Sequence, residues 1–231
     1  VLPYFRRSEA NENGADAFHG HDGPLAVSNA HSPNPLFRAF IDAGGQAGYP
    51  LTDDFNGPRQ EGFGPYQFTI RKGERCSTSM AFLRPALSRP NLKVETGALA
   101  SRILLDGKRA VGVEYIQGGR TRTARARQTV ILAGGVINSP QLLQLSGIGD
   151  GERLSALGIK TVHHLPGVGQ NLQDHLDCTV INRCLQPITL HSQPNPITLG
   201  MPGIRYLVNG TGPGTSNGLE SGAYGKSLPD L

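Results

Sequence analysis

The sequence is poor in the residues that hold small secreted domains together. It has 3 cysteines and no tryptophan in 231 residues. An odd number of cysteines without zinc-ligand spacing argues against a disulfide framework and favours a reducing compartment. We therefore expect a cytoplasmic protein, from a parent that could still associate with a membrane. No run approaches 18 consecutive apolar residues and the N-terminus lacks a signal-peptide pattern, so the sequence predicts no transmembrane segment.

Charged residues are also few, at 17% of the chain, against roughly 25% in ordinary soluble domains. The net charge is +4, and the basic residues are spread along the sequence. The one basic run, over 120–127, has no aromatic residue between its arginines on which a base could stack. We interpret this run as an edge strand protected by charge and predict no nucleic-acid partner.

Glycine and proline are abundant, with 31 and 17 residues. A chain of this composition turns often and has little long helix. Its length is enough for one large domain or two small ones with a real core. Local patterns then predict a mixed fold of the α+β or α/β kind, with both helices and strands.

Several elements follow from short-range signals. Asn34 and Pro35 precede apolar residues at helical spacing and predict a helix over 35–47. Three strand-like runs joined by Asp-Gly and Gly-Gly pairs predict a three-stranded meander. The runs of the meander are 99–105, 109–116 and 120–129. Other predicted elements are strands over 25–28, 66–71 and 161–165, helical turns over 152–157, and strand-like runs from 177 onward.

A strand, a glycine turn and a helix follow the meander. The apolar run 130–133 is typical of a strand buried on both faces, which Gly134 and Gly135 end tightly. Ser139 and Pro140 predict the start of the helix. Glycines in such a turn let backbone N–H groups approach a nucleotide, and the alternative is a tight turn that only joins helix to strand.

Other motifs are incomplete. The dinucleotide fingerprint G-x-G-x-x-G occurs nowhere in the sequence. The run 225–227 ends like a phosphate loop, but Glu220 stands where its first glycine is required. Asp174 and His175 lack the G-x-S-x-G serine that a hydrolytic triad needs. We therefore predict neither a nucleoside triphosphatase nor a serine hydrolase.

Two pairs of histidines raise the question of a metal. His19 with His21, and His163 with His164, have no carboxylate or cysteine at an established ligand spacing. We interpret them as solvated or hydrogen-bonded histidines and predict no metal site.

Residues 129–149, TVILAGGVINSPQLLQLSGIG, resemble the second signature segment of the glucose-methanol-choline (GMC) oxidoreductases, flavoenzymes that oxidise alcohols with FAD. The resemblance continues over nearly the whole chain and is nearest to the branch of choline and alcohol dehydrogenases. The further segments are NPLFRAFIDAGGQAGYPLTDDFNG from Asn34, QEGFGPYQFTIRKGERCSTSMAFLRP from Gln60, RPNLKVETGALASRILLDGKRAVGVEY from Arg89 and LPGVGQNLQDH from Leu165.

The resemblance implies a two-part fold, with a meander in the FAD-binding domain and an antiparallel sheet in the substrate domain. Residues 1–75 would be a substrate-domain or cap segment, 76–175 the returning part of the FAD-binding domain, and 176–231 a segment of the substrate-domain sheet. The family's G-x-G-x-x-G strand and its catalytic histidine match no part of this sequence. We therefore expect a central fragment with no catalytic residue in this chain, inactive when isolated.

The resemblance also implies roles for individual residues. The backbone of Ala100, where valine is more usual, would touch the adenine of FAD. Ala133, Gly134 and Gly135 would form the turn that flanks the adenosine. Glu220 lies in a stretch that resembles a substrate-domain strand facing the flavin, where a carboxylate could hold a cationic alcohol such as choline. The alternative for Glu220 is a surface or helix-start glutamate.

The implied function is hydride transfer from a small-molecule alcohol to FAD, with oxygen, a quinone or a carrier protein open as the electron acceptor. Two other functions remain open. One is a binding or structural remnant that kept the fold without the chemistry. The other is an FAD-dependent lyase of the hydroxynitrile type on the same scaffold.

Overall fold

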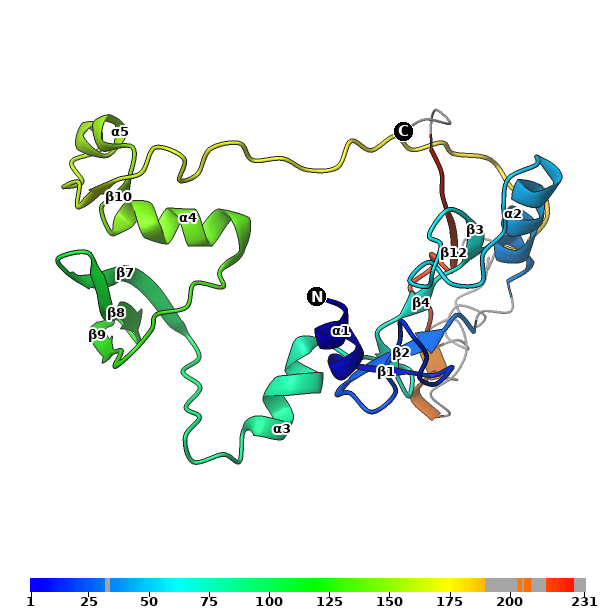
Figure 1. The fold of residues 1–231 in the computed structure, drawn as a ribbon, viewed down its shortest axis with the longest axis horizontal. Coiled ribbons are helices and arrows are strands. Elements are labelled where there is room, and N and C mark those ends of the chain that lie inside the picture. Colours follow the sequence, from blue (N-terminus) through cyan, green and yellow to red (C-terminus); the bar gives the residue numbers. More distant parts are fainter. Residues whose placement is uncertain (32–33, 190–202, 205, 209–214, 227–231) are drawn as a thin grey trace. The chain divides into compact units, whose positions relative to one another are not determined.

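Helices and short strands alternate along the chain, and the mixed fold expected from the sequence is confirmed (Figure 1). The computed structural model describes residues 1–31, 34–189, 203–204, 206–208 and 215–226. The chain divides into two compact units, residues 1–92 with 181–231 and residues 93–180. Within the described residues, no helix combines the length and the apolarity that crossing a bilayer requires.

The first unit begins with a three-stranded sheet in the order β1-β2-β4. Strand β1 is parallel to β2, and β2 is antiparallel to β4. The predicted strand over 25–28 is confirmed as β2, whereas the predicted strand over 66–71 is broken in two because β5 turns away to pair with β6. The elements are α1 (Leu2–Ser8), β1 (Glu9–Asn11), β2 (Leu25–Asn29), β4 (Gln67–Phe68), β5 (Ile70–Arg71) and β6 (Glu74–Arg75).

Helix α2 (Pro35–Gln46) confirms the helix predicted over 35–47. The side chain of Asn34 accepts a hydrogen bond from the backbone N–H of Leu36 at 3.0 Å, which satisfies a donor of the first turn. The helix packs on a two-stranded ribbon of β3 (Gly62–Pro65) and β12 (Ser221–Tyr224). At this contact the ring of Phe63 lies against the bare backbone of Gly44, where a methyl group would overlap the ring.

A π-helical turn, η1 (Ser79–Leu83), and the short helix α3 (Arg84–Ala86) complete this unit. Cys76 and Ala81 are buried beside them, at 3% exposed each. The Sγ atom of Cys76 accepts a hydrogen bond from the backbone N–H of Ala26 at 3.4 Å. The residues before η1 are thereby attached to strand β2.

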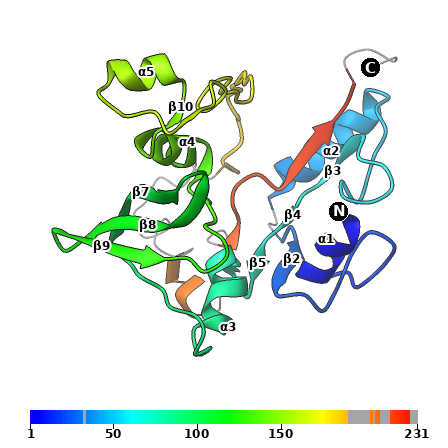
Figure 2. The same cartoon turned by 60° about the vertical axis from the view of Figure 1, so that its left-hand side comes forward.

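The second unit is built on the predicted meander, which is confirmed as three antiparallel strands in the order β7-β8-β9 (Figure 2). All residues of β9 are exposed at the edge of this sheet, which confirms the interpretation of the basic run as an edge strand. Strand β9 ends at Arg125 and not at residue 129. The strands are β7 (Ala98–Asp106), β8 (Arg109–Gln117) and β9 (Arg120–Arg125).

The prediction of a buried strand over 130–133 is wrong for this structure. No strand of the described residues pairs with this run, and Ile131 is 83% exposed. An extended run without a partner strand has no ladder of hydrogen bonds to define it.

The predicted start of the next helix is also wrong, because α4 (Gly135–Leu145) begins before Ser139 and contains Pro140. A proline removes one backbone hydrogen bond and kinks a helix, but it need not end one that has already begun.

Two of the three remaining predicted elements are confirmed. The helical turns over 152–157 are confirmed as α5, whose first N–H groups bond to the side chain of Asp150. The short strand over 161–165 is confirmed as β11, parallel to β10. The strand-like runs from 177 are absent over the described residues 177–189, and 190–202 lie outside the described residues. These elements are β10 (Ile148–Gly149), α5 (Gly151–Ala156) and β11 (His163–His164).

Candidate functional site

The turn before α4 presents its backbone to solvent. Ala133, Gly134 and Gly135 are all exposed. Gly135 has a φ of 83°, a left-handed value that residues with a side chain rarely adopt. A Cβ atom added there would meet nothing within 4 Å. The structure thus explains Gly135 by backbone conformation and leaves the turn accessible to a ligand.

Ser139 closes this turn from the helix side. Its Oγ atom accepts a hydrogen bond from the backbone N–H of Gly134 at 3.0 Å. A Cβ atom on Gly134 would lie 3.0 Å from the Cβ of Asn138, which is tighter than ordinary van der Waals contact. The role that the sequence suggested for Ser139, satisfying a free donor near the helix start, is therefore carried out one turn into the helix.

Ala100 lies on β7, whose outer edge is not paired with another strand of the described residues. At that edge the backbone N–H of Ile103 donates to the Oγ of Ser146 at 2.8 Å and so points away from β8. The register of β7 and β8 shifts between Ala100 and Arg102, so Ala100 lies two residue pairs away from Ile103. In an antiparallel ladder the backbone groups of successive pairs point alternately toward and away from the partner strand. The backbone N–H and C=O of Ala100 therefore point to the same open edge, where a ring with donors and acceptors could bind.

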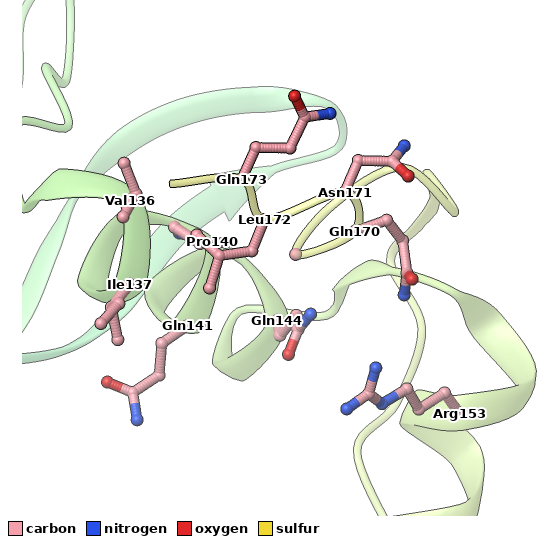
Figure 3. A pocket seen from close by; sticks show the side chains of 11 residues that line it. Val136, Ile137, Pro140, Gln141, Gln144, Arg153, Gln170, Asn171, Leu172 and Gln173 are labelled. Atoms are coloured by element: carbon pink, nitrogen blue, oxygen red, sulfur yellow. The ribbon is translucent and has the colours of Figure 1, made fainter. Parts of the chain in front are cut away.

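Beside α4 lies an open groove of about 730 Å³ (Figure 3). One wall is a face of α4 from Val136 to Gln144 and the other is the segment 169–173. Figure 3 shows side-chain amides from both walls and the guanidinium of Arg153 at one end. Such a lining offers many hydrogen bonds and one positive charge. The groove suits a polar or anionic group of a ligand. Its polar side chains are Gln141, Gln144, Arg153, Gln170, Asn171 and Gln173.

Two residues with left-handed backbone shape the second wall. Gly169 has a φ of 76° and Asn171 a φ of 55°. The Nε2 of Gln144 donates to the carbonyl of Val168 at 3.1 Å, and a Cβ on Gly169 would lie 2.6 Å from that nitrogen. This segment belongs to the family resemblance from Leu165, but no site residue was predicted in it. A glycine and, two residues later, an asparagine are the two residue types that best tolerate this conformation. Their spacing was the available sequence signal for a left-handed backbone here.

Glu220 belongs to the other unit and is 4% exposed. It directly precedes β12, so it is neither a surface glutamate nor the start of a helix. The backbone N–H of Tyr66 donates to the carbonyl of Glu220 at 3.0 Å. The carboxyl group of Glu220 is therefore buried at the end of a strand.

His19 is a second buried polar group, 7% exposed. Its Nδ1 lies 3.0 Å from a carboxylate oxygen of Glu9, and its Nε2 lies 2.8 Å from Oδ2 of Asp54. Burial alone lowers the pKa of His19, but the hydrogen bonds to Asp54 and Glu9 outweigh it and raise the pKa above the usual value. The interpretation of His19 as a hydrogen-bonded histidine is confirmed, although its two partners were not foreseen.

The other histidines are bound more loosely. His21 faces Asp22 with 56% of its side chain exposed. The Nδ1 of His164 accepts a hydrogen bond from the backbone N–H of Gly151 at 3.0 Å. Across the part of the chain that the structure describes, no three His, Cys, Asp or Glu side chains gather in a way that could hold a metal ion.

Comparisons with known proteins show which chains are similar to this one. Mitochondrial choline dehydrogenase from Homo sapiens is 52% identical over 230 residues, covering 100% of this chain and 39% of that protein. The oxygen-dependent choline dehydrogenase from Brucella suis biovar 1 (strain 1330) is 51% identical over 237 residues, covering 100% of this chain and 43% of that protein. The chain therefore spans about two fifths of the length of the curated relatives that it matches.

Solved structures show the same fold. An FAD-dependent oxidoreductase from Chaetomium thermophilum matches with a TM-score of 0.81 and 28% identity, covering 95% of this chain and 41% of that chain. Pyridoxine 4-oxidase from Mesorbium loti matches with a TM-score of 0.68 and 32% identity, covering 71% and 33%. The family model described as GMC oxidoreductase matches residues 1–177. The chain belongs to the GMC oxidoreductase family.

Proposed function

We propose that this chain is part of an FAD-dependent alcohol oxidoreductase that acts on a cationic alcohol of the choline type. The observation that carries the proposal is the 52% identity to a choline dehydrogenase along the whole chain. The stretch around Glu220 resembles a substrate-domain strand, and the burial of this glutamate, at 4% exposed, supports a role for its carboxyl group in holding a cationic substrate. The substrate would be a small-molecule alcohol, and the electron acceptor stays open between oxygen, a quinone and a carrier protein.

The residues present suit the adenosine end of FAD. Backbone groups at the open edge of Ala100 can hydrogen-bond to an adenine, and the accessible turn Ala133–Gly134–Gly135 can flank the adenosine. Neither contact depends on a side chain, so alanine at position 100 does not impair it. Bound FAD would accept a hydride from the alcohol carbon. We assign this chain the tasks of holding the nucleotide and orienting the alcohol, and no proton transfer.

Exposed apolar side chains near the turn support a binding role for this face. Val136 and Ile137, on the first turn of α4, are 72% and 68% exposed. Apolar groups gathered beside a nucleotide turn indicate a surface that another part of a protein or a ligand covers. We propose that the remainder of a longer enzyme, of the size of the relatives, covers it.

The domain roles follow the same proposal. Residues 1–75 and 176–231 would serve the substrate side, and 76–175 would serve FAD. The division of the chain into 1–92 with 181–231, and 93–180, supports this assignment, since its limits lie within 17 and 5 residues of the expected ones (92 − 75 = 17; 180 − 175 = 5). Cys76, Cys178 and Cys184 are all free, which supports a reducing compartment.

Anaerobic reduction of the flavin tests the proposal. The full-length gene product, purified with FAD, should lose its visible flavin absorbance when choline is added, and the isolated chain should oxidise no alcohol. Glu220→Gln should raise the KM for choline about tenfold, because one desolvated charge pair is lost. The control Glu61→Gln alters an exposed glutamate and should leave the KM unchanged.

Other outcomes reject the proposal. Cleavage of a cyanohydrin without flavin reduction would identify a lyase. A full-length product that retains no flavin and converts no alcohol would identify a structural or binding protein.

A further inference from the structure

Tyr66 and Glu220 face each other across the ribbon of β3 and β12. The register pairs Pro65 with Ser221 and Gly64 with Gly222, so the next pair along the ribbon is Tyr66 with Glu220. The hydrogen bond from the Tyr66 N–H to the Glu220 carbonyl extends the ladder to this pair. Directly opposed residues of antiparallel strands place their side chains on one face as close neighbours. The phenol ring and the carboxyl group therefore share a face.

Gly222 leaves room on that face for the ring. Gly64 and Gly222 form the neighbouring pair with the same orientation. A Cβ atom on Gly222 would overlap the Oη and Cζ atoms of Tyr66. The ring thus lies over the bare backbone of Gly222, and any side chain at that position would displace it.

Aromatic neighbours fix the ring at its far end. Phe55, 7% exposed, has its ring centroid 5.2 Å from that of Tyr66 and 5.0 Å from that of Tyr224. Burial raises the pKa of Tyr66, and a hydrogen bond with Tyr224 raises it further. Tyr66 is therefore held by a backbone bond at Glu220, by the glycine beneath it and by two aromatic rings.

We infer that Tyr66 is the positioning residue of Glu220 and, through it, determines the preference of the site for a cationic over a neutral alcohol. The inference rests on the proposed function and gives Tyr66 a role that the family resemblance does not assign. A carboxylate binds an ammonium group well only when its position is fixed beforehand, since ordering it on binding costs affinity. The ring of Tyr66, on the same face of the ribbon as that carboxylate, adds an aromatic surface that favours the same charge.

The test compares two alcohols on the full-length gene product. One is choline, and the other is its uncharged analogue with a tert-butyl group in place of trimethylammonium. Tyr66→Ala should raise the KM for choline about tenfold, change the KM for the neutral alcohol less than about twofold, and affect kcat less than KM. Tyr66→Phe keeps the ring over Gly222 and loses only the bond to Tyr224, so its effect on choline should be about threefold or less.

Gly222→Ala gives a second route to the same displacement. It should raise the KM for choline in the parent protein and add little in the Tyr66→Ala background, where no ring remains to be displaced. The control is Gly225→Ala, since a Cβ at this position just after β12 meets nothing within 4 Å. FAD content and the melting temperature of each variant identify any change that comes from unfolding.

The outcomes separate the inference from the function on which it rests. Equal changes in KM for both alcohols, or additive effects of Gly222→Ala and Tyr66→Ala, would overturn the positioning role. If Glu220→Gln selectively weakens choline while the Tyr66 variants do not, only this inference fails. If Glu220→Gln has no effect and choline reduces no flavin, the proposed function and the inference fail together.

Discussion

The His19 cluster, formed by His19, Glu9 and Asp54, is packed within the chain, whereas the apolar side chains of the segment 130–137 are exposed. His19 is buried between Glu9 and Asp54, and both of its ring nitrogens have partners in the same unit. In the segment 130–137, Ile131, Val136 and Ile137 are 83%, 72% and 68% exposed. The first region supplies its own partners, whereas the second presents apolar side chains outward.

This difference separates stability from function. Changes in the His19 cluster should alter the stability of the chain itself. Changes in the segment 130–137 should scarcely alter its stability and should act on what binds there.

The largest effect is expected at His19. His19→Ala leaves the carboxylates of Glu9 and Asp54 facing each other without the imidazole, and it should destabilise the chain by about 3 kcal/mol. The partial exposure of both carboxylates, 16% and 30% of the side chain, keeps the effect from being larger. Urea denaturation measures it. His21→Ala, the exposed neighbour, should change stability by less than about 0.5 kcal/mol, and equal effects of the two variants would contradict the cluster's role.

A smaller effect is expected where α2 meets β3. Gly44→Ala places a methyl group into the ring of Phe63 and should cost about 2 kcal/mol. At the next residue of the same helix, a Cβ on Gly45 would lie 3.5 Å from the nearest atoms of Leu51. Gly45→Ala should therefore stabilise by about 0.5–1 kcal/mol through helix propensity. If the melting temperatures of Gly44→Ala and Gly45→Ala shift in the same direction, the close contact between Gly44 and Phe63 is contradicted.

The pH dependence of stability sharpens the role of His19. The pKa of His19 is raised in the folded state above its ordinary value of 6.5, so its contribution to stability is complete below that value and is lost as pH rises through the folded pKa. The charged groups that face it are Glu9, Asp54 and Asp16. Denaturation midpoints between about pH 6 and about pH 9 should fall for the parent and stay flatter for His19→Gln. An equal dependence of the denaturation midpoint on pH in the two proteins would contradict the ion pairs of His19 with Glu9 and Asp54.

The smallest effect is expected in the segment 130–137. Ile131→Ala should change the stability of the chain by less than about 0.5 kcal/mol, since the side chain is already exposed. Ile103→Ala, at 5% exposed, is the matched control and should cost about 3 kcal/mol. A large loss of stability from Ile131→Ala would mean that the segment is packed within the chain.

Local signals predicted the elements that depend on neighbours in sequence. The meander follows from its glycine turns, and the start of α2 follows from Asn34 and Pro35. The partners of His19 lie 10 and 35 residues away, and Tyr66 lies 154 residues from Glu220 (220 − 66 = 154). No periodic pattern connects such distant positions. The strand predicted over 130–133 failed for a related reason, since a strand needs a partner and the described residues provide none.

Amide hydrogen exchange tests most directly whether the segment 130–137 is a binding face that other groups complete. The isolated chain should show protected amides in the meander and in α2, and fast exchange over 130–133, where no strand ladder is formed. In the full-length gene product with FAD bound, the amides of 130–136 should become protected. Equal exchange of these amides in the two proteins, fast or slow, would contradict the account.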